Sequence, residues 1–156
     1  MNEGLPRLFR STGQRGYSST ISADPRCVHA RKLEHEIDVR FTPVECTVQT
    51  FEGVVHAAPG DAIITGTAGE RWRVSRGRFA DRYRPVPPTM AGEPGRYVSL
   101  PNHILAVPMS GDFEVLLADG VSRLSGIAGE WLVDYGDGSL GIVSQPIFAT
   151  TYEIIG

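Results

Sequence analysis

The chain has 156 residues, of which 41% are hydrophobic and 21% charged, so it can form one domain with a core or two small packed lobes. No apolar run approaches the ~20 residues that span a bilayer, and two cysteines are too few for a disulfide scaffold, so neither a membrane partner nor a disulfide-rich secreted domain is predicted. The net charge of −3 conceals an asymmetry, because residues 1–84 hold 13 Arg and Lys against 10 Asp and Glu, whereas residues 85–156 hold 2 against 8.

Residues 1–36 are polar and rich in arginine, without clear periodicity. They predict an N-terminal arm that is partly disordered or strand-swapping, with one helical turn near residues 30–36. The segment Arg15–Ser18 is similar to a mitochondrial presequence cleavage site, which keeps mitochondrial import open as an alternative to a cytoplasmic location.

Residues 37–86 are predicted to form the first of two strand-rich repeats. Apolar and charged residues alternate over Ile37–Phe41, as in a half-buried strand. Ser75 is expected to cap a short helical turn that carries Phe79, because its hydroxyl can accept an amide hydrogen bond. The other predicted strands are Cys46–Phe51, Val54–His56, a hairpin of Ala62–Thr65 with Arg71–Val74, and an edge strand at Tyr83–Val86.

Residues 87–102 are predicted to be a linker, because their prolines and glycines favour an extended chain that does not pair in a sheet. Residues 103–156 then form the second predicted repeat, in which Ser144 caps a turn that carries Phe148. Its predicted strands are Glu114–Leu117, Trp131–Val133, Gly141–Val143 and Thr151–Ile155.

The two repeats align without a gap over residues 60–86 and 129–155, with identities at 7 of 27 positions. The shared residues are turn glycines and apolar anchors. Such repetition predicts a mainly β fold of two tandem small units, SH3-like or small-barrel in type, with short helical turns; an α+β fold is the alternative. Each repeat has about five short strands, so the copies are expected to pack together or to be completed by another chain.

Six arginines lie within 14 residues of the first repeat, with Asp81 as the only acid among them. Their counterparts in the second repeat are not basic: Leu140, Ile142, Gln145, Ile147, Thr151 and Glu153. The planar guanidinium of arginine binds phosphate or carboxylate through paired hydrogen bonds, whereas Trp72 alternates to the opposite strand face and is expected in the core. The candidate ligand-binding residues are therefore Arg71, Arg73, Arg76, Arg78, Arg82 and Arg84, with a solvated face that pairs with acidic residues as the competing interpretation.

No catalytic constellation is found in the sequence. The four histidines are scattered, and none stands in a Ser/His/Asp or Cys/His pattern. The glycine-rich segments Gly66–Gly69 and Gly136–Gly138 each connect two predicted strands, so hairpin turns are expected rather than phosphate-binding loops. Neither a metal nor a cofactor is predicted, since the zinc-ligand types in the first third match no standard finger in their spacing: Cys27, His29, His35 and Cys46.

A family resemblance rests on the two turn regions. Pro59–Gly66, followed by Gly69-Glu70 and a spaced Phe and Tyr, resembles a pattern of small bacterial and prophage proteins. In the second repeat, Gly129–Trp131 and Asp134–Gly138 resemble the related family named for its Pro-Gly-Asp-Tyr-Gly motif. The chain departs from these patterns by Ala62 in place of an aromatic residue and by Ala128 in place of proline. The resemblance implies a bacterial or phage cytoplasm and brings no established activity or catalytic residues.

These features predict a non-enzymatic, homo-oligomeric protein that binds an anionic small ligand, such as a nucleotide or a phosphorylated metabolite. In a phage or prophage setting, sequestration of a signalling nucleotide would suit the arginines. Two alternatives stay open: a structural or protein-interaction module with an acidic partner, and a nucleotide-processing enzyme. Nucleic acid is not expected as a partner, because the total charge is negative and one short cluster offers few phosphate contacts.

Overall fold

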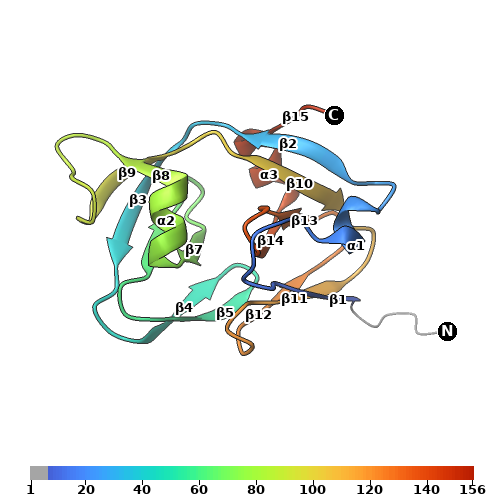
Figure 1. The fold of residues 1–156 in the computed structure, drawn as a ribbon, viewed down its shortest axis with the longest axis horizontal. Helices are drawn as coiled ribbons and strands as arrows, with labels where there is room; N and C mark the ends of the chain where they lie inside the picture. Colours follow the sequence, from blue (N-terminus) through green and yellow to red (C-terminus); the bar gives the residue numbers. More distant parts are fainter. Residues whose placement is uncertain (1–6) are drawn as a thin grey trace. The chain divides into compact units, whose positions relative to one another are not determined.

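The computed structural model describes residues 7–156, which divide into two compact units (Figure 1). The first unit, Lys32–Asn102, contains the first repeat, and the second unit combines the second repeat, His103–Gly156, with residues 7–31. Strands and short helices make up both units, so the prediction of a mainly β fold is confirmed. The first six residues of the predicted arm lie outside the described residues. No helix within residues 7–156 is long and apolar enough to cross a bilayer.

The first unit consists of short strands and one seven-residue helix, with the bounds β3 Glu36–Phe41, β4 Cys46–Thr50, β5 Gly53–Ala57, β6 Ala62–Thr65, β7 Arg71–Val74, α2 Arg76–Arg82, β8 Tyr83–Pro85 and β9 Gly95–Ser99. A five-stranded antiparallel sheet has the order β7-β6-β3-β9-β8, and β4 pairs with β5 in a separate hairpin. The predicted hairpin at residues 62–74 and the predicted edge strand at Tyr83 are both present.

The second unit repeats this plan and adds an N-terminal strand, with the bounds β1 Arg7–Arg10, α1 Ser19–Ser22, β2 Val28–Lys32, β10 His103–Pro108, β11 Phe113–Leu116, β12 Arg123–Gly126, β13 Trp131–Asp134, β14 Leu140–Val143, α3 Gln145–Thr151 and β15 Tyr152–Ile154. Its five-stranded sheet has the order β14-β13-β10-β2-β15, and a second sheet has the order β1-β11-β12. Each sheet of the described residues ends in two edge strands, so neither unit forms a closed barrel.

The two repeats exchange one strand with each other. β9 precedes β10 in the chain but pairs with β3 and β8 of the first unit, while β2 precedes β3 but lies between β10 and β15 of the second unit. An offset of 67 residues relates β2 to β9 and β3 to β10, so that Arg31 corresponds to Val98 and Glu36 to His103. The pair Glu36 with Val98 is therefore equivalent to the pair His103 with Arg31. The chain therefore contains two linear repeats, β2–β8 and β9–β15, and each completes the sheet of the other.

The same aromatic pair anchors both cores. Phe79 on α2 stacks on Tyr83 with ring centroids 4.9 Å apart, and Phe148 on α3 stacks on Tyr152 at 5.0 Å. All four side chains are buried. These identities between the repeats are therefore part of the scaffold, because they pack each helix onto its sheet.

Beside this aromatic pair, each core contains one large and one small residue, and the two units place them on opposite strands. The first unit has Ala62 on β6 and Tyr97 on β9, whereas the second has Trp131 on β13 and Ala30 on β2, and all four are buried. Tyr97 contacts the helix-borne phenylalanine at 4.9 Å between centroids, and Trp131 stacks on its counterpart at 4.0 Å. The volume missing at Ala62, relative to Trp131 of the second unit, is thus supplied from β9.

Three local predictions differ from the structure. The helical turn near residues 30–36 is wrong, because β2 extends to Lys32 and β3 begins at Glu36; sheet pairing outweighs local helix preference there. Residues 95–99 of the predicted linker form β9, which begins directly after the last proline. Ser75 and Ser144 do precede helices, but their hydroxyls make no capping hydrogen bond; their carbonyls accept the first helical N–H instead.

Candidate functional site

The six predicted arginines lie on one continuous strand-helix-strand stretch of the first unit. They are distributed over β7 (Arg71 and Arg73), α2 (Arg76, Arg78 and Arg82) and β8 (Arg84). In the second unit the stretch β14-α3-β15 has the same order of elements, although no basic residue stands at any matched position. The fold of this stretch therefore does not require arginines.

Arg73 differs from the other five because it is turned inward. Its Nη1 donates to Asp61 Oδ2 at 3.1 Å, and the two side chains are only 19% and 7% exposed. The same carboxylate oxygen accepts the Ala58 N–H at 2.9 Å. Within the described residues, Arg73 Nε is buried without a hydrogen-bond partner. Any ligand contact by Arg73 must therefore compete with a buried ion pair that belongs to the fold.

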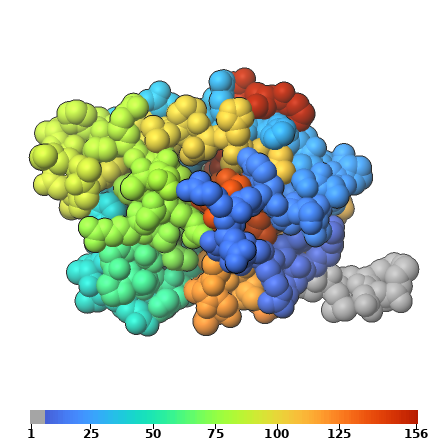
Figure 2. Space-filling view, in the orientation of Figure 1, coloured from blue at the N-terminus to red at the C-terminus, as the bar shows by residue number. Residues whose placement is uncertain are grey.

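The three α2 arginines differ in their exposure. Arg76 is exposed, and its side chain lies across Gly60, about 3.5 Å from where a Cβ would stand. Arg78 and Arg82 are half-buried and four residues apart, so they lie on one side of the helix. In the view of Figure 2, the green residues of α2 reach the surface of the first unit. Among these three residues, Arg76 is therefore the one that a ligand can reach most directly.

The two terminal arginines of the cluster are exposed. Arg84 Nη2 lies 3.2 Å from Glu34 Oε1, and both side chains are more than half exposed. A surface ion pair of this kind contributes little free energy, so Arg84 can exchange its partner for another anion. Arg71 stands at the start of β7, opposite Thr65 on β6.

A further cation near this stretch was not apparent from the sequence. Lys32 Nζ lies 5.7 Å from the Trp72 ring centroid and 5.1 Å from that of Tyr83, and it donates a hydrogen bond to the Tyr83 hydroxyl at 3.2 Å. Trp72 packs against the core of the first unit, as predicted. Lys32 precedes the repeat predicted from the sequence, residues 37–86, and carries no local signal; only its being the single lysine of the chain sets it apart.

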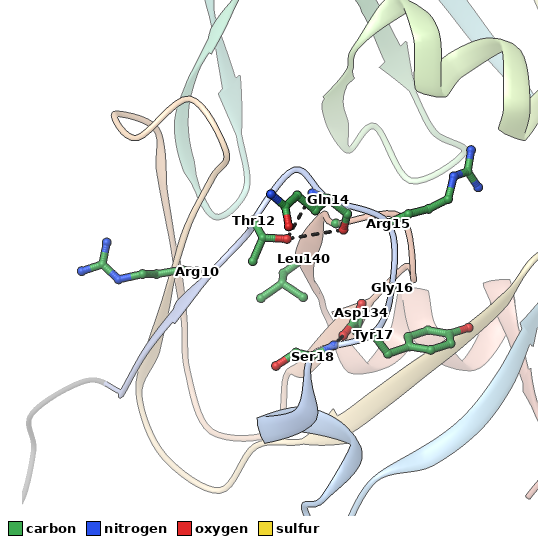
Figure 3. Close-up of a pocket in the computed structure, with 10 residues that line it drawn as sticks. Arg10, Thr12, Gln14, Arg15, Gly16, Tyr17, Ser18, Asp134 and Leu140 are labelled. Carbon is green, nitrogen blue, oxygen red and sulfur yellow. Dashed lines mark hydrogen bonds between the residues drawn. The ribbon is translucent and has the colours of Figure 1, made fainter.

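The second unit contains a different candidate, a cavity of about 130 Å³ between the N-terminal segment and the β13–β14 turn. Figure 3 shows that the Arg10 and Arg15 side chains extend away from Leu140 and Asp134. Small-molecule sites usually have volumes of about 300 Å³ or more, so a nucleotide does not fit here. The arginines of this cavity are also aimed away from its interior.

Asp134 lies in the interior of this cavity, and backbone N–H groups already occupy both of its oxygens. The side chain is 1% exposed, and its two oxygens accept the Ser18 N–H at 2.7 Å and the Gly136 N–H at 3.0 Å. Burial raises the Asp134 pKa even though both hydrogen bonds act to lower it. Burial, followed by the charge of Asp134, also raises the pKa of the Tyr17 hydroxyl. The cavity therefore holds a carboxyl group whose ionised form is disfavoured.

We expect Asp134 to make the stability of the protein depend on pH. Because its pKa is raised on folding, the folded chain binds this proton more tightly than the unfolded chain. The resulting contribution is complete below the ordinary aspartate pKa and is lost as the pH rises through the raised value. Urea unfolding across this range should show a steeper loss of unfolding free energy with rising pH in the wild type than in Asp134→Asn. Equal slopes for the two proteins would contradict the assignment.

Metal and thiol chemistry find no support in the described residues. Within residues 7–156, no group of three or more His, Cys, Asp or Glu is placed to hold a metal ion. Cys27 and Cys46 are free thiols and half-buried, and burial raises the pKa of Cys27, which disfavours its reactive thiolate. The arginine stretch is therefore the stronger candidate site.

A family model described as PGDYG protein matches residues 53–153. The chain belongs to the PGDYG family. The resemblance seen in the sequence is thereby confirmed. The region that matches the PGDYG family extends from β5 into β15, so it includes the arginine stretch and the Gly136–Gly138 turn. No curated protein and no solved structure matches the chain.

Proposed function

We propose that the protein binds an anionic small ligand, a nucleotide or a phosphorylated metabolite, through the arginines of β7 and α2. The observation that carries this proposal is the contrast between two equivalent stretches. β14-α3-β15 forms without a single arginine, whereas β7-α2-β8 contains six. Arg73 pairs with the buried Asp61, but the equivalent stretch folds without charges at the other five positions. Their concentration on one short stretch favours a role in recognition.

The α2 arginines are the proposed anchors. Arg78 and Arg82 share one side of the helix, which suits two phosphate oxygens or two neighbouring phosphate groups. Arg76 and Arg71 are exposed and extend the positive surface along the chain. Arg73 is assigned to the scaffold instead, because Asp61 holds it inside the unit.

The proposed role is binding without turnover. Residues 71–84 contain no histidine, cysteine or lysine, and Asp81 is their only acid, so the stretch lacks a nucleophile paired with a base. In a bacterial or phage-infected cell, such a protein would sequester a signalling nucleotide. A protein-interaction module is the second candidate, favoured by the extended segment that the second unit already holds against β11.

Isothermal titration with ATP, GTP and inorganic pyrophosphate tests the proposal. At least one probe should bind, and Arg78→Ala/Arg82→Ala should weaken that binding by about tenfold or more, since each charged hydrogen bond contributes roughly 1.5–3 kcal/mol. The matched control is Arg31→Ala/Arg123→Ala, which removes two exposed arginines from the second unit and leaves the same net charge. Circular dichroism of both double variants checks that folding is intact.

Two outcomes would contradict the proposal. If no probe gives a binding signal in the titration, the protein does not bind a nucleotide or pyrophosphate as proposed. If both double variants weaken binding equally, the effect comes from net charge rather than from a site. Native mass spectrometry of the protein as purified adds a measurement without a chosen probe. A co-purifying small anion would support the proposal, and a co-purifying protein would favour the interaction module.

A further inference from the structure

The N-terminal segment of the second unit is held as an added strand rather than as part of a core. Residues 7–10 pair with β11 in parallel, from Arg7 beside Phe113 to Arg10 beside Leu116. The backbone then continues along the β13–β14 turn, where Gly13 N donates to Gly138 O at 2.9 Å and Gly16 N to Gly136 O at 2.8 Å. Figure 1 shows this path as the dark blue chain beside β11.

Two glycines of the turn provide the surface on which this segment lies. A Cβ at Gly138 would collide with the backbone of Gln14, and a Cβ at Gly136 would come within 2.8 Å of the Tyr17 ring. The matched turn of the first unit has Thr67 in place of Gly136, and the space beside Gly69 is open. The glycines of this turn thus do more here than form a turn, because they admit another backbone.

Little apolar surface holds the segment in place. None of the residues 7–18 is buried, and Leu8 is 40% exposed. Among its side chains, Phe9 meets Phe113 edge to face at 6.4 Å, and Ser11 Oγ accepts the Leu140 N–H at 3.0 Å. Hydrogen bonds between peptide groups contribute only about 0.5–1.5 kcal/mol each in water, so release of the strand costs little compared with unfolding of the unit.

The attachment changes abruptly after Gly16. Ser18 N–H is bound by the buried Asp134 carboxylate, and Ile21 on α1 is 1% exposed in the core. Gly16 itself has a φ of +121°, a conformation that glycine adopts without strain. Residues from Ser18 onward are therefore anchored, and Gly16 is suited to act as a hinge for the residues before it.

We propose that residues 7–16 are an exchangeable strand, and that the groove formed by β11 and the Gly136–Gly138 turn takes this strand from a second copy of the chain, giving a reciprocal dimer. This inference is independent of the proposed anion site, which lies in the first unit. The second copy is the occupant that fits, because the groove already accommodates this backbone in this register and a second copy presents the identical segment. Exchange of an identical element between copies is a low-cost route to dimers.

The chain itself provides a precedent for such exchange. β2 and β9 each complete the sheet of the other repeat, so strands are already contributed by one linear repeat to the other within a single molecule. A strand that adds to an edge through backbone hydrogen bonds is recognised mainly by its main chain, and its register is set by a few side chains. Here those side chains are Phe9 and Ser11.

Disulfide trapping in the full chain tests the exchange, with both native cysteines replaced by serine in every variant. Leu8 and Glu114 are direct neighbours in the β1–β11 register, a spacing that a disulfide can bridge. Leu8→Cys/Glu114→Cys should close within one chain, which checks the docking geometry. Leu8→Cys and Glu114→Cys chains, mixed at high concentration and oxidised mildly, should give a covalent heterodimer whose yield rises with concentration.

The matched control replaces Glu114→Cys by Ser125→Cys. Ser125 lies opposite Glu114 on β12, one strand farther from β1 and outside disulfide reach. We expect the Leu8–Glu114 mixture to give at least fivefold more heterodimer than the Leu8–Ser125 mixture. Equal yields, with the double variant closing normally within its own chain, would overturn the exchange. Failure of the double variant to close would overturn the docked strand itself.

Discussion

Arg73→Ala should lower the free energy of unfolding by about 3 kcal/mol, because it leaves the buried Asp61 carboxylate without its guanidinium partner. The Ala58 N–H would still donate to that carboxylate, so the loss should lie at the lower end of the range for broken buried ion pairs. Urea denaturation followed by tryptophan fluorescence measures it, since Trp72 is adjacent on β7.

Arg71→Ala is the matched control for this change. Arg71 lies two residues away on the same strand and is exposed, so its removal should shift the unfolding free energy by no more than about 0.5 kcal/mol. The second unit suggests a rescue, because its equivalent of Arg73 is the buried Ile142. Asp61→Asn/Arg73→Ile should therefore recover most of the loss, as when apolar residues replace a buried ion pair. Equal stability of Arg73→Ala and Arg71→Ala would refute the scaffold role.

The sequence predicted those parts of the fold that depend on local pattern. The β6–β7 hairpin is specified by an apolar strand, a glycine-rich turn and a strand in which charged and apolar residues alternate. The burial of Phe79 and Tyr83 follows from their repetition at Phe148 and Tyr152. Strand alternation also placed Trp72 in the core and Arg71 outside it. The hydrophobic pattern predicted burial correctly where a residue's environment depends on neighbours within a few positions in the sequence.

Pairing between distant segments was beyond the sequence pattern. β2 and β9 share no identity at matched positions, because Ala30 fills one core where Tyr97 fills the other. Their equivalence becomes visible only from the register with β10 and β3, so the first was expected to be an arm and the second a linker. Because the two cores place their large residue on different strands, the matched residues of β2 and β9 differ in size, and an alignment does not detect the repeat there.

The candidate site shows the same division. The grouping of six arginines is a local feature and was predicted, but the difference between Arg73 and its neighbours depends on Asp61, which belongs to a separate turn. The placement of Lys32 over Trp72 and Tyr83 depends on β2 and β9 completing different sheets. A sequence gives the charges available to a site, whereas tertiary packing decides which of them are already used.

Gly138→Ala should release the N-terminal segment, because the added methyl group would occupy the position of the Gln14 backbone. Gly138 also has a φ of +91°, so alanine adds a conformational cost of about 1–2 kcal/mol. Trypsin cleavage after Arg10 and Arg15 reports the release directly, since both residues are exposed and lie within the docked segment. Cleavage should be about tenfold faster than in the wild type if docking loses 1.4 kcal/mol, provided that reclosing is faster than cleavage.

Gly69→Ala separates the two effects of the substitution. Gly69 occupies the matched position of the first unit with a φ of +79°, but no atom lies within 4 Å of its would-be Cβ. It should therefore show the conformational cost in urea denaturation and leave the rate of cleavage after Arg10 and Arg15 unchanged. If both variants were cleaved at the wild-type rate, Gly138 would be explained by its turn conformation alone. If only Gly138→Ala accelerates cleavage, a glycine is needed at this position because the backbone of Gly13 and Gln14 packs directly against it.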